Sequence, residues 1–269
     1  MRSHSARRPW YARARALFSS LSELRNPRQQ PARTRLGVTS LEDRIYPSIT
    51  PLGEFAVPTT TANDQDHPAV AADAAGDFLA VWHRPGPAGG EGIYGQRFNA
   101  IGSPVGAEFM ANENPYSSYY STAVAMAPDG RAVITWYAYD QTDGGVNSWK
   151  IFARLYNADG TPHGAEFKVN TVSTGLQSDP AVAMAADGSF VIAFVDQRDY
   201  VDPYMEIAAR RFDADGNGVG SQFPVNTTTA YNQYAPSIGM DAAADFVIGW
   251  TSQFQDGMWN GVFARAFSA

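Results

Sequence analysis

Aromatic side chains flanked by Asp, Asn and Gln are the residues of this sequence best suited to binding a ligand. Flat rings can cover the faces of sugars while polar groups bond the hydroxyls, and Tyr and Trp are also favoured in protein contacts. We expect the ligand-binding side chains to be Tyr119, Tyr137, Tyr139, Trp149, Tyr200, Tyr204, Tyr234 and Trp259. The alternative is that these rings only pack long loops against the body of the fold.

Catalytic signatures are absent from the sequence: it contains no Gly-x-Ser-x-Gly, His-Glu-x-x-His or phosphate-binding-loop pattern. Acidic pairs such as Asp196 with Asp199 or Asp202 could in principle act as glycosidase carboxylates. However, Arg198 beside them would lower their pKa, which is the wrong direction for a general acid. We therefore predict no catalytic residues, and an enzyme remains the alternative.

Metal-ligand patterns are also weak. His4 lies in the N-terminal segment, and His67, His83 and His163 occupy unrelated positions of the repeats described below. We therefore expect no shared metal site and no cofactor. The stretch from Asp213 to Gly218 opens like a calcium loop, but residue 224, where the last ligand should be, is Pro. A β-turn is the better interpretation there.

The elements that position these residues repeat four times. A Phe within Gly-x-Glu-Phe or a variant of it recurs at residues 55, 109, 167 and 223, and a second aromatic follows 27 residues later in every copy, at Trp82, Trp136, Phe194 and Trp250. A third aromatic precedes the next such Phe by 11 residues, at Phe98, Tyr156 and Phe212, and recurs at Phe267 in the last copy. All variation in length therefore lies between the second and third aromatics, where recognition loops are usually placed.

Each repeat contains four short β-strand candidates separated by turn signals, at a period of 54–58 residues. This period fits propeller blades better than sandwich domains. The repeats begin with a lone fourth strand, Gly53–Val57, and end after a third strand. We predict an all-β fold, a small four-bladed β-propeller of four-stranded antiparallel blades in which Gly53–Val57 closes the last blade. An open array of four units is the alternative.

Positions that recur in every repeat are expected to serve the scaffold. The second aromatics should form the core between blades. Gln65, Gln177 and Gln233 occupy one matched position, with Tyr119 in the second copy, and we expect the glutamines to bond loop backbone.

Charge divides the 269-residue, cysteine-free chain into two parts. Residues 1–50 carry a balance of +7, whereas the remainder carries −14. An acidic body repels phosphate backbones, so nucleic acid is excluded as a partner. No apolar run is long enough for a transmembrane helix. We predict a basic leader over residues 1–50, largely disordered, and a propeller domain over residues 51–269.

The segment from Leu41 to Arg44, Leu-Glu-Asp-Arg, follows an Arg-rich stretch and precedes Pro47 and Ser48. This combination resembles the N-terminal segment of large exported planctomycetal proteins. The repeat, Pro-Ala-Val-Ala-Met through Ala-Arg-Arg-Phe to Gly-x-Glu-Phe-x-Val-Asn-Thr, is similar to one found in large secreted bacterial proteins. The resemblance implies an extracellular or cell-surface location.

The sequence therefore predicts an exported, non-catalytic protein that binds a glycan or an envelope protein through its variable loops. Two alternatives stay open: a hydrolase acting on extracellular polysaccharide, and a purely structural spacer or assembly module.

Overall fold

A computed structural model describes residues 53–60, 63–86, 91–114, 118–140, 148–172, 174–197 and 204–269. The chain divides into two units, Met1–Pro51 and Leu52–Ala269, and every described residue belongs to the second. The predicted leader and its Leu-Glu-Asp-Arg segment therefore lie outside the described residues. In the described part, no helix could span a membrane.

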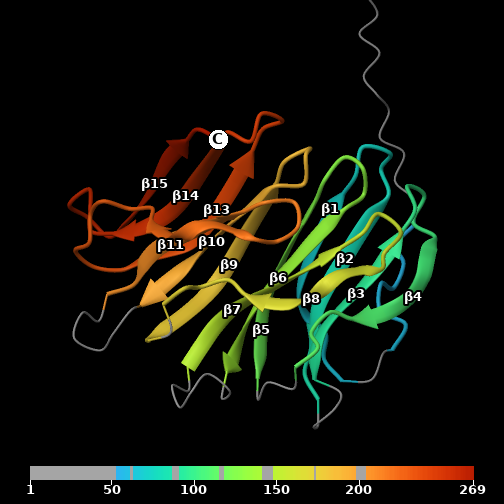
Figure 1. Ribbon diagram of the computed structural model, residues 1–269. Coiled ribbons are helices and arrows are strands. Elements are labelled where there is room, and N and C mark those ends of the chain that lie inside the picture. Colours follow the sequence, from blue (N-terminus) through green and yellow to red (C-terminus); the bar gives the residue numbers. More distant parts are fainter. Residues whose placement is uncertain are drawn as a thin grey trace, which may run out of the picture. The chain divides into compact units, whose positions relative to one another are not determined.

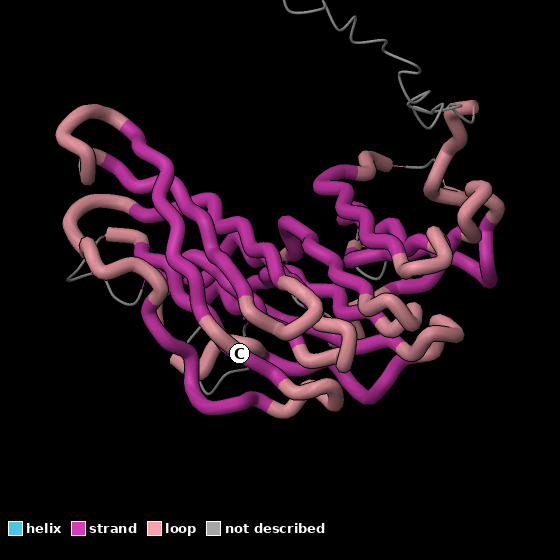
Figure 2. The backbone as a smooth tube through the Cα atoms, turned by 90° about the horizontal axis from the view of Figure 1, so that it is seen from above, coloured by secondary structure: helices cyan, strands magenta, loops and turns pink. Residues whose placement is uncertain are grey.

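The described residues form four antiparallel sheets and no helix (Figures 1 and 2). The strands of the first sheet are β1 (Asp66–Ala72), β2 (Phe78–Arg84), β3 (Gly92–Phe98) and β4 (Pro104–Met110). Those of the second are β5 (Tyr119–Met126), β6 (Ala132–Asp140), β7 (Ser148–Tyr156) and β8 (Pro162–Lys168). Those of the third are β9 (Leu176–Met184), β10 (Phe190–Gln197), β11 (Glu206–Phe212) and β12 (Gly218–Pro224), and those of the fourth are β13 (Gln233–Met240), β14 (Phe246–Gln253) and β15 (Asn260–Phe267). Within each sheet the strands lie in chain order, so the all-β prediction with four blade-like repeats is confirmed.

The turns between strands have the predicted chemistry. Gly188, between β9 and β10, has φ +91°, a conformation that glycine adopts without steric cost. Asp187 accepts the backbone N–H of Ser189 at 2.9 Å and thereby closes the turn. Between β11 and β12, Asp213 accepts the N–H of Asn217 at 2.8 Å, which is a turn contact, as expected in preference to a calcium loop.

The second aromatic of each repeat is buried. Trp82, Trp136, Phe194 and Trp250 are at most 6% exposed. Trp136, Phe194 and Trp250 each belong to one of three apolar clusters, and each cluster draws on neighbouring sheets. For these three side chains the prediction that the repeated aromatics form the core between blades is confirmed.

Adjacent sheets are joined by a contact that recurs. The Phe of each Gly-x-Glu-Phe-type motif packs on the third aromatic of the following sheet, with ring centroids 5.0 Å apart for Phe109 and Tyr156 and 5.4 Å apart for Phe167 and Phe212. Beside it, an Arg donates to the carbonyl two residues beyond that Phe: Arg154 reaches Ala111 at 3.2 Å. Arg210 and Arg265 repeat this bond to Val169 and Val225, at 2.8 and 3.0 Å.

Gly53–Val57 does not complete the fourth sheet, so this part of the fold prediction is wrong. The fourth sheet has three strands, and residues 53–57 form no strand. Instead Phe55 packs on Phe98 of the first sheet at 5.3 Å, in the place that the corresponding Phe takes before each later sheet. Phe55 thus makes the inter-sheet contact although residues 53–57 form no strand. Val70 of β1 consequently remains 66% exposed, beside a groove of about 690 Å³.

Candidate functional site

Four aromatic side chains of the second sheet lie together and form what we call the aromatic cluster: Tyr120, Tyr137, Tyr139 and Trp149. Antiparallel pairing places them there, because Tyr120 lies opposite Tyr137 across β5 and β6, and Tyr139 lies opposite Trp149 across β6 and β7. Trp149 contacts the other three rings at centroid distances of 5.3–5.4 Å. Tyr120 also stacks on Tyr137 at 5.8 Å.

The aromatic cluster is partly open to solvent. Tyr120 is 40% exposed, whereas Tyr137, Tyr139 and Trp149 are half-buried. Burial, assisted by the nearby Asp179 carboxylate, raises the pKa of Tyr137 to about 12. Its hydroxyl therefore stays protonated at neutral pH and is available as a hydrogen-bond donor.

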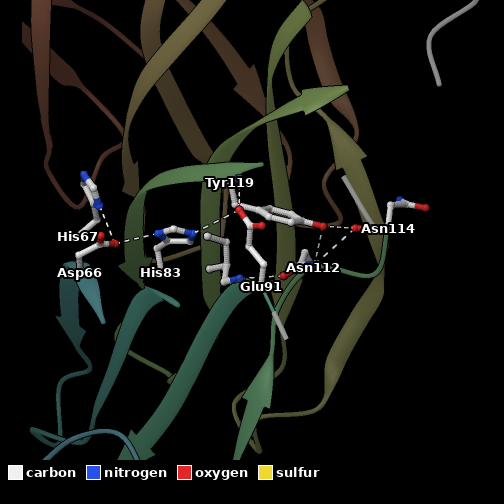
Figure 3. Close-up of polar contacts among 8 residues, drawn as sticks. Asp66, His67, His83, Glu91, Asn112, Asn114 and Tyr119 are labelled. Atoms are coloured by element: carbon white, nitrogen blue, oxygen red, sulfur yellow. Dashed lines mark hydrogen bonds and ion pairs between the residues drawn. The ribbon is translucent and has the colours of Figure 1, made fainter. Parts of the chain in front are cut away.

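A polar group adjoins the aromatic cluster at the first sheet, and we call Asp66, His67 and His83 the Asp–His group. Figure 3 shows the three side chains turned toward one another. Asp66 Oδ1 lies 2.9 Å from His67 Nδ1 and 2.8 Å from His83 Nδ1. The His83 ring lies 5.7 Å from that of Tyr120, so the two groups form one continuous surface.

The convergence of the Asp–His group results from a β-bulge. Asp66 pairs with His83 across β1 and β2, and the register shifts between Asp66 and Ala69. Within the bulge, His67 adopts φ +50°. His67 and His83 hold unrelated positions in the repeats, yet both contact the same carboxylate. The hairpin turn between β1 and β2 was the missed signal, because it sets which residues of the two strands face each other.

His83 also has an acidic neighbour on its other side. Its Nε2 lies 3.9 Å from Glu91 Oε1, and the side chain of His83 is only 4% exposed (Figure 3). Glu91 in turn accepts the backbone N–H of Tyr119 at 3.3 Å. One imidazole therefore lies between two carboxylates, an arrangement that can hold or transfer a proton.

The pKa of Asp66 is lowered by its two histidine neighbours. Burial acts to raise its pKa, but hydrogen bonds from His67 and His83, together with their charges, outweigh burial and hold the pKa of Asp66 below its ordinary value. The Asp66 carboxylate can therefore act as a base or a ligand, not as an acid, at neutral pH.

Tyr119 is a correction to the predicted site. It is 1% exposed, and its hydroxyl accepts a bond from Asn112 at 3.0 Å and donates to the carbonyl of Asn114 (Figure 3). It occupies the matched glutamine position and performs the same structural task. At that position, Gln177 donates to the carbonyl of Thr174 at 2.9 Å and Gln233 to that of Ala230 at 3.3 Å, as predicted.

The other described residues of the predicted site, Tyr204, Tyr234 and Trp259, belong to the third and fourth repeats. Tyr204 contacts Tyr231, and Tyr231 contacts Phe254, at 5.7 and 5.2 Å. Tyr234 is half-buried against the third core cluster, and Trp259 is 75% exposed near the start of β15. Tyr200 lies outside the described residues. The structure thus brings Tyr137, Tyr139 and Trp149 into contact with one another.

The acidic pair considered for hydrolysis is not supported at Asp196. This carboxylate is fully buried and accepts bonds from Gln177 at 3.1 Å and Gln222 at 2.9 Å. These contacts tie β10 to β9 and β12 and leave the buried carboxylate no access to a ligand. Asp199 and Asp202 lie outside the described residues.

Neither a protein-family model nor a curated protein matches the chain. Solved structures do. An α-L-arabinanase of Penicillium chrysogenum, complexed with arabinobiose, is 16% identical with a TM-score of 0.55, over 76% of this chain and 63% of that one. A protein of unknown function from Dyadobacter fermentans is 13% identical with a TM-score of 0.54, over 79% and 63%.

A GH93 α-L-arabinofuranosidase of Fusarium graminearum, also in complex with arabinobiose, is 11% identical with a TM-score of 0.53, over 75% of this chain and 62% of that one. The chain therefore spans less than two thirds of the length of these three proteins. At such identities the likeness establishes the propeller-like fold alone.

Proposed function

We propose that this protein binds a saccharide at the surface formed by the aromatic cluster and the Asp–His group. The observation that carries the proposal is the contact of four aromatic rings beside ionisable side chains at one end of the first two sheets. Aromatic faces favour the apolar faces of sugar rings, while Asp66 and the hydroxyl of Tyr137 supply an acceptor and a donor. Two proteins of similar fold were solved with arabinobiose, which supports a glycan over an envelope protein as the partner.

Titration of the full chain with arabinobiose and with soluble arabinan, followed by calorimetry, tests this proposal. We expect Trp149→Ala and Tyr120→Ala each to weaken binding by about fivefold or more, since each removes an aromatic contact of about 1 kcal/mol or more. Tyr231→Ala, in the separate aromatic group of the last two sheets, is the matched control. Equal effects of the control and the two variants, or no binding across a wider glycan array, would overturn the proposal.

Hydrolysis of a glycosidic bond is the second candidate, favoured by Asp66 and Glu91 on opposite sides of His83. The arabinan-acting enzymes of similar fold support it further. If the protein is a hydrolase, it should release reducing ends from arabinan. Asp66→Asn and Glu91→Gln should each lower the rate of this release by about 100-fold or more. Asp64→Asn, an exposed neighbour, should retain activity. Binding without release by the unsubstituted protein would leave recognition as the function and exclude hydrolysis of this polysaccharide.

We further propose that the protein is exported, by a leader of the planctomycetal type in residues 1–50. The opposite charges of the two parts of the sequence and the Leu-Glu-Asp-Arg segment support this. Deletion of residues 2–50 should retain the protein inside the cell, as followed by immunoblotting of cell fractions. Equal export of the truncated chain would contradict the proposal.

A further inference from the structure

The Asp–His group places three potential metal ligands in one small volume. One ligand atom of each residue lies within 4.8 Å of the other two, and Asp66 Oδ1 lies 2.9 Å from His67 Nδ1 and 2.8 Å from His83 Nδ1. Two imidazole nitrogens and a carboxylate oxygen are the ligand set of many sites for Zn²⁺ and related divalent transition metals. We propose that Asp66, His67 and His83 bind one divalent transition-metal ion of the Zn²⁺ class.

The environment of His83 supplies an independent argument. Its Nε2 is buried and has no hydrogen-bond partner in the described part of the chain. With Nδ1 bound to a metal, Nε2 carries the ring proton and directs it toward Glu91 Oε1, 3.9 Å away. A metal-bound histidine whose second nitrogen faces a carboxylate is the usual outer-shell arrangement of such sites. The contact of Glu91 with the N–H of Tyr119 orients that carboxylate.

Comparison with the other sheets shows that the scaffold does not require these ligands. Every first strand has the same bulge, and its central residue has positive φ in all four sheets: His67, Ser121, Asp179 and Ala235. The cross-strand pair that matches Asp66 and His83 is Tyr120 with Tyr137 in the second sheet, Ser178 with Val195 in the third, and Tyr234 with Thr251 in the fourth. The bulge is therefore structural, whereas the ligand set is particular to the first sheet.

A metal ion can reach the Asp–His group from solvent, and the side chains of the group can move to bind it. The side chains of Asp66 and His67 are each 46% exposed, so an ion can reach the group from solvent. Metal–ligand bonds of about 2.0–2.2 Å hold two ligands of a tetrahedral ion farther apart than the 2.9 and 2.8 Å between Asp66 Oδ1 and the two Nδ1 atoms, so the side chains must adjust on binding. Three protein ligands leave a tetrahedral ion at least one position for water or an oxygen of a bound molecule. Tyr120 lies next to His83, with 5.7 Å between the two ring centroids.

Titration of untagged, chelator-treated full chain with Co²⁺ and with Zn²⁺ tests the proposal. We expect one equivalent of Co²⁺ to give visible d–d absorption and Zn²⁺ to displace it. His67→Asn and Asp66→Asn should each weaken Zn²⁺ binding by about 10-fold to 100-fold. Asn is chosen at residue 67 because it tolerates positive φ. Near-ultraviolet circular dichroism of each variant verifies folding.

His163→Ala and His4→Ala are the matched controls, since both remove a histidine outside the Asp–His group. Both should retain the Co²⁺ spectrum and the affinity for Zn²⁺. The proposal is overturned if the unsubstituted chain binds Zn²⁺ no more tightly than Asp66→Asn, or if either control abolishes binding. The readout is independent of saccharide, so it stands or fails separately from the proposed function.

Discussion

At the scale of the residue, one buried asparagine closes each of the first three sheets. Asn112, Asn170 and Asn226 are at most 6% exposed, and each accepts a backbone N–H of the third strand, from Ile93, Ile151 and Ile207. The side-chain amide of Asn170 also donates to the carbonyl of Val172 at 2.6 Å. These asparagines recur because the fourth strand has ended at this point and offers no carbonyl to the third strand. The asparagine side chain accepts the buried N–H of the third strand instead.

Replacement of Asn170 by Ala should lower the free energy of unfolding by about 1–3 kcal/mol, because the buried N–H of Ile151 would lose its acceptor. Urea denaturation followed by circular dichroism measures the change. Ser221→Ala, at an exposed position of β12, is the control and should stay within about 0.5 kcal/mol. A loss as small as that of the control would show that Ile151 finds another acceptor.

At the scale of the element, carboxylates close the tight turns and respond to acid. Hydrogen bonds from the side chains of Thr161, Ser189 and Asn217, with backbone N–H groups, lower the pKa of Asp159, Asp187 and Asp213 below the ordinary value of 3.8. A carboxylate whose pKa is lower in the folded state contributes stability above its unfolded pKa and loses it as the pH falls. These turns should therefore weaken below about pH 4.

The triple variant Asp159→Asn, Asp187→Asn, Asp213→Asn should lose less stability than the unsubstituted chain between pH 6 and pH 3, because an amide does not titrate in this range. Urea midpoints at the two pH values measure the difference. Asp64→Asn, an exposed carboxylate away from these turns, should lose as much as the unsubstituted chain. An unchanged pH dependence in the triple variant would place the acid-sensitive groups elsewhere.

At the scale of the whole molecule, the first and fourth sheets of the described part expose apolar side chains that inner sheets bury. Val70 and Val262 are 66% and 85% exposed, whereas Val124, matched to Val70 in the second sheet, packs against the first core cluster. Residues 53–60 supply recurrent inter-sheet contacts to the first sheet, because Phe55 packs on Phe98 and Thr59 N–H donates to Glu108 at 2.8 Å.

Val70→Lys and Val262→Lys should each change the free energy of unfolding by no more than about 0.5 kcal/mol, since both side chains are in water. Val124→Lys should destabilise far more, because an ammonium without a partner would be buried. Denaturation together with light scattering measures stability and mass. A large loss at Val70 or Val262 would instead reveal that another sheet or a second copy covers these faces in solution.

The four repeats, the strands and the buried aromatics were readable from the sequence, because spacing and alternation act locally and recur. The predicted pairing of Gly53–Val57 failed because pairing depends on where the last sheet ends in space, and the Gly-Glu-Phe motif only requires that Phe55 pack on Phe98. Residue type likewise singled out Tyr137, Tyr139 and Trp149, whose rings the structure brings into contact, yet also selected Tyr119, whose ring fills a core position.

The Asp–His group is a feature that the sequence did not predict and that only the tertiary structure shows. Sequence reasoning compared His67 and His83 by their places in the repeat and found nothing in common. Tertiary structure decided otherwise, because the hairpin register brings strand residues 17 positions apart to one point and the bulge turns His67 toward the same carboxylate. The sequence alone tells which residue types are present. Which side chains meet depends on the register of the strands, and the register is set only when the strands pair.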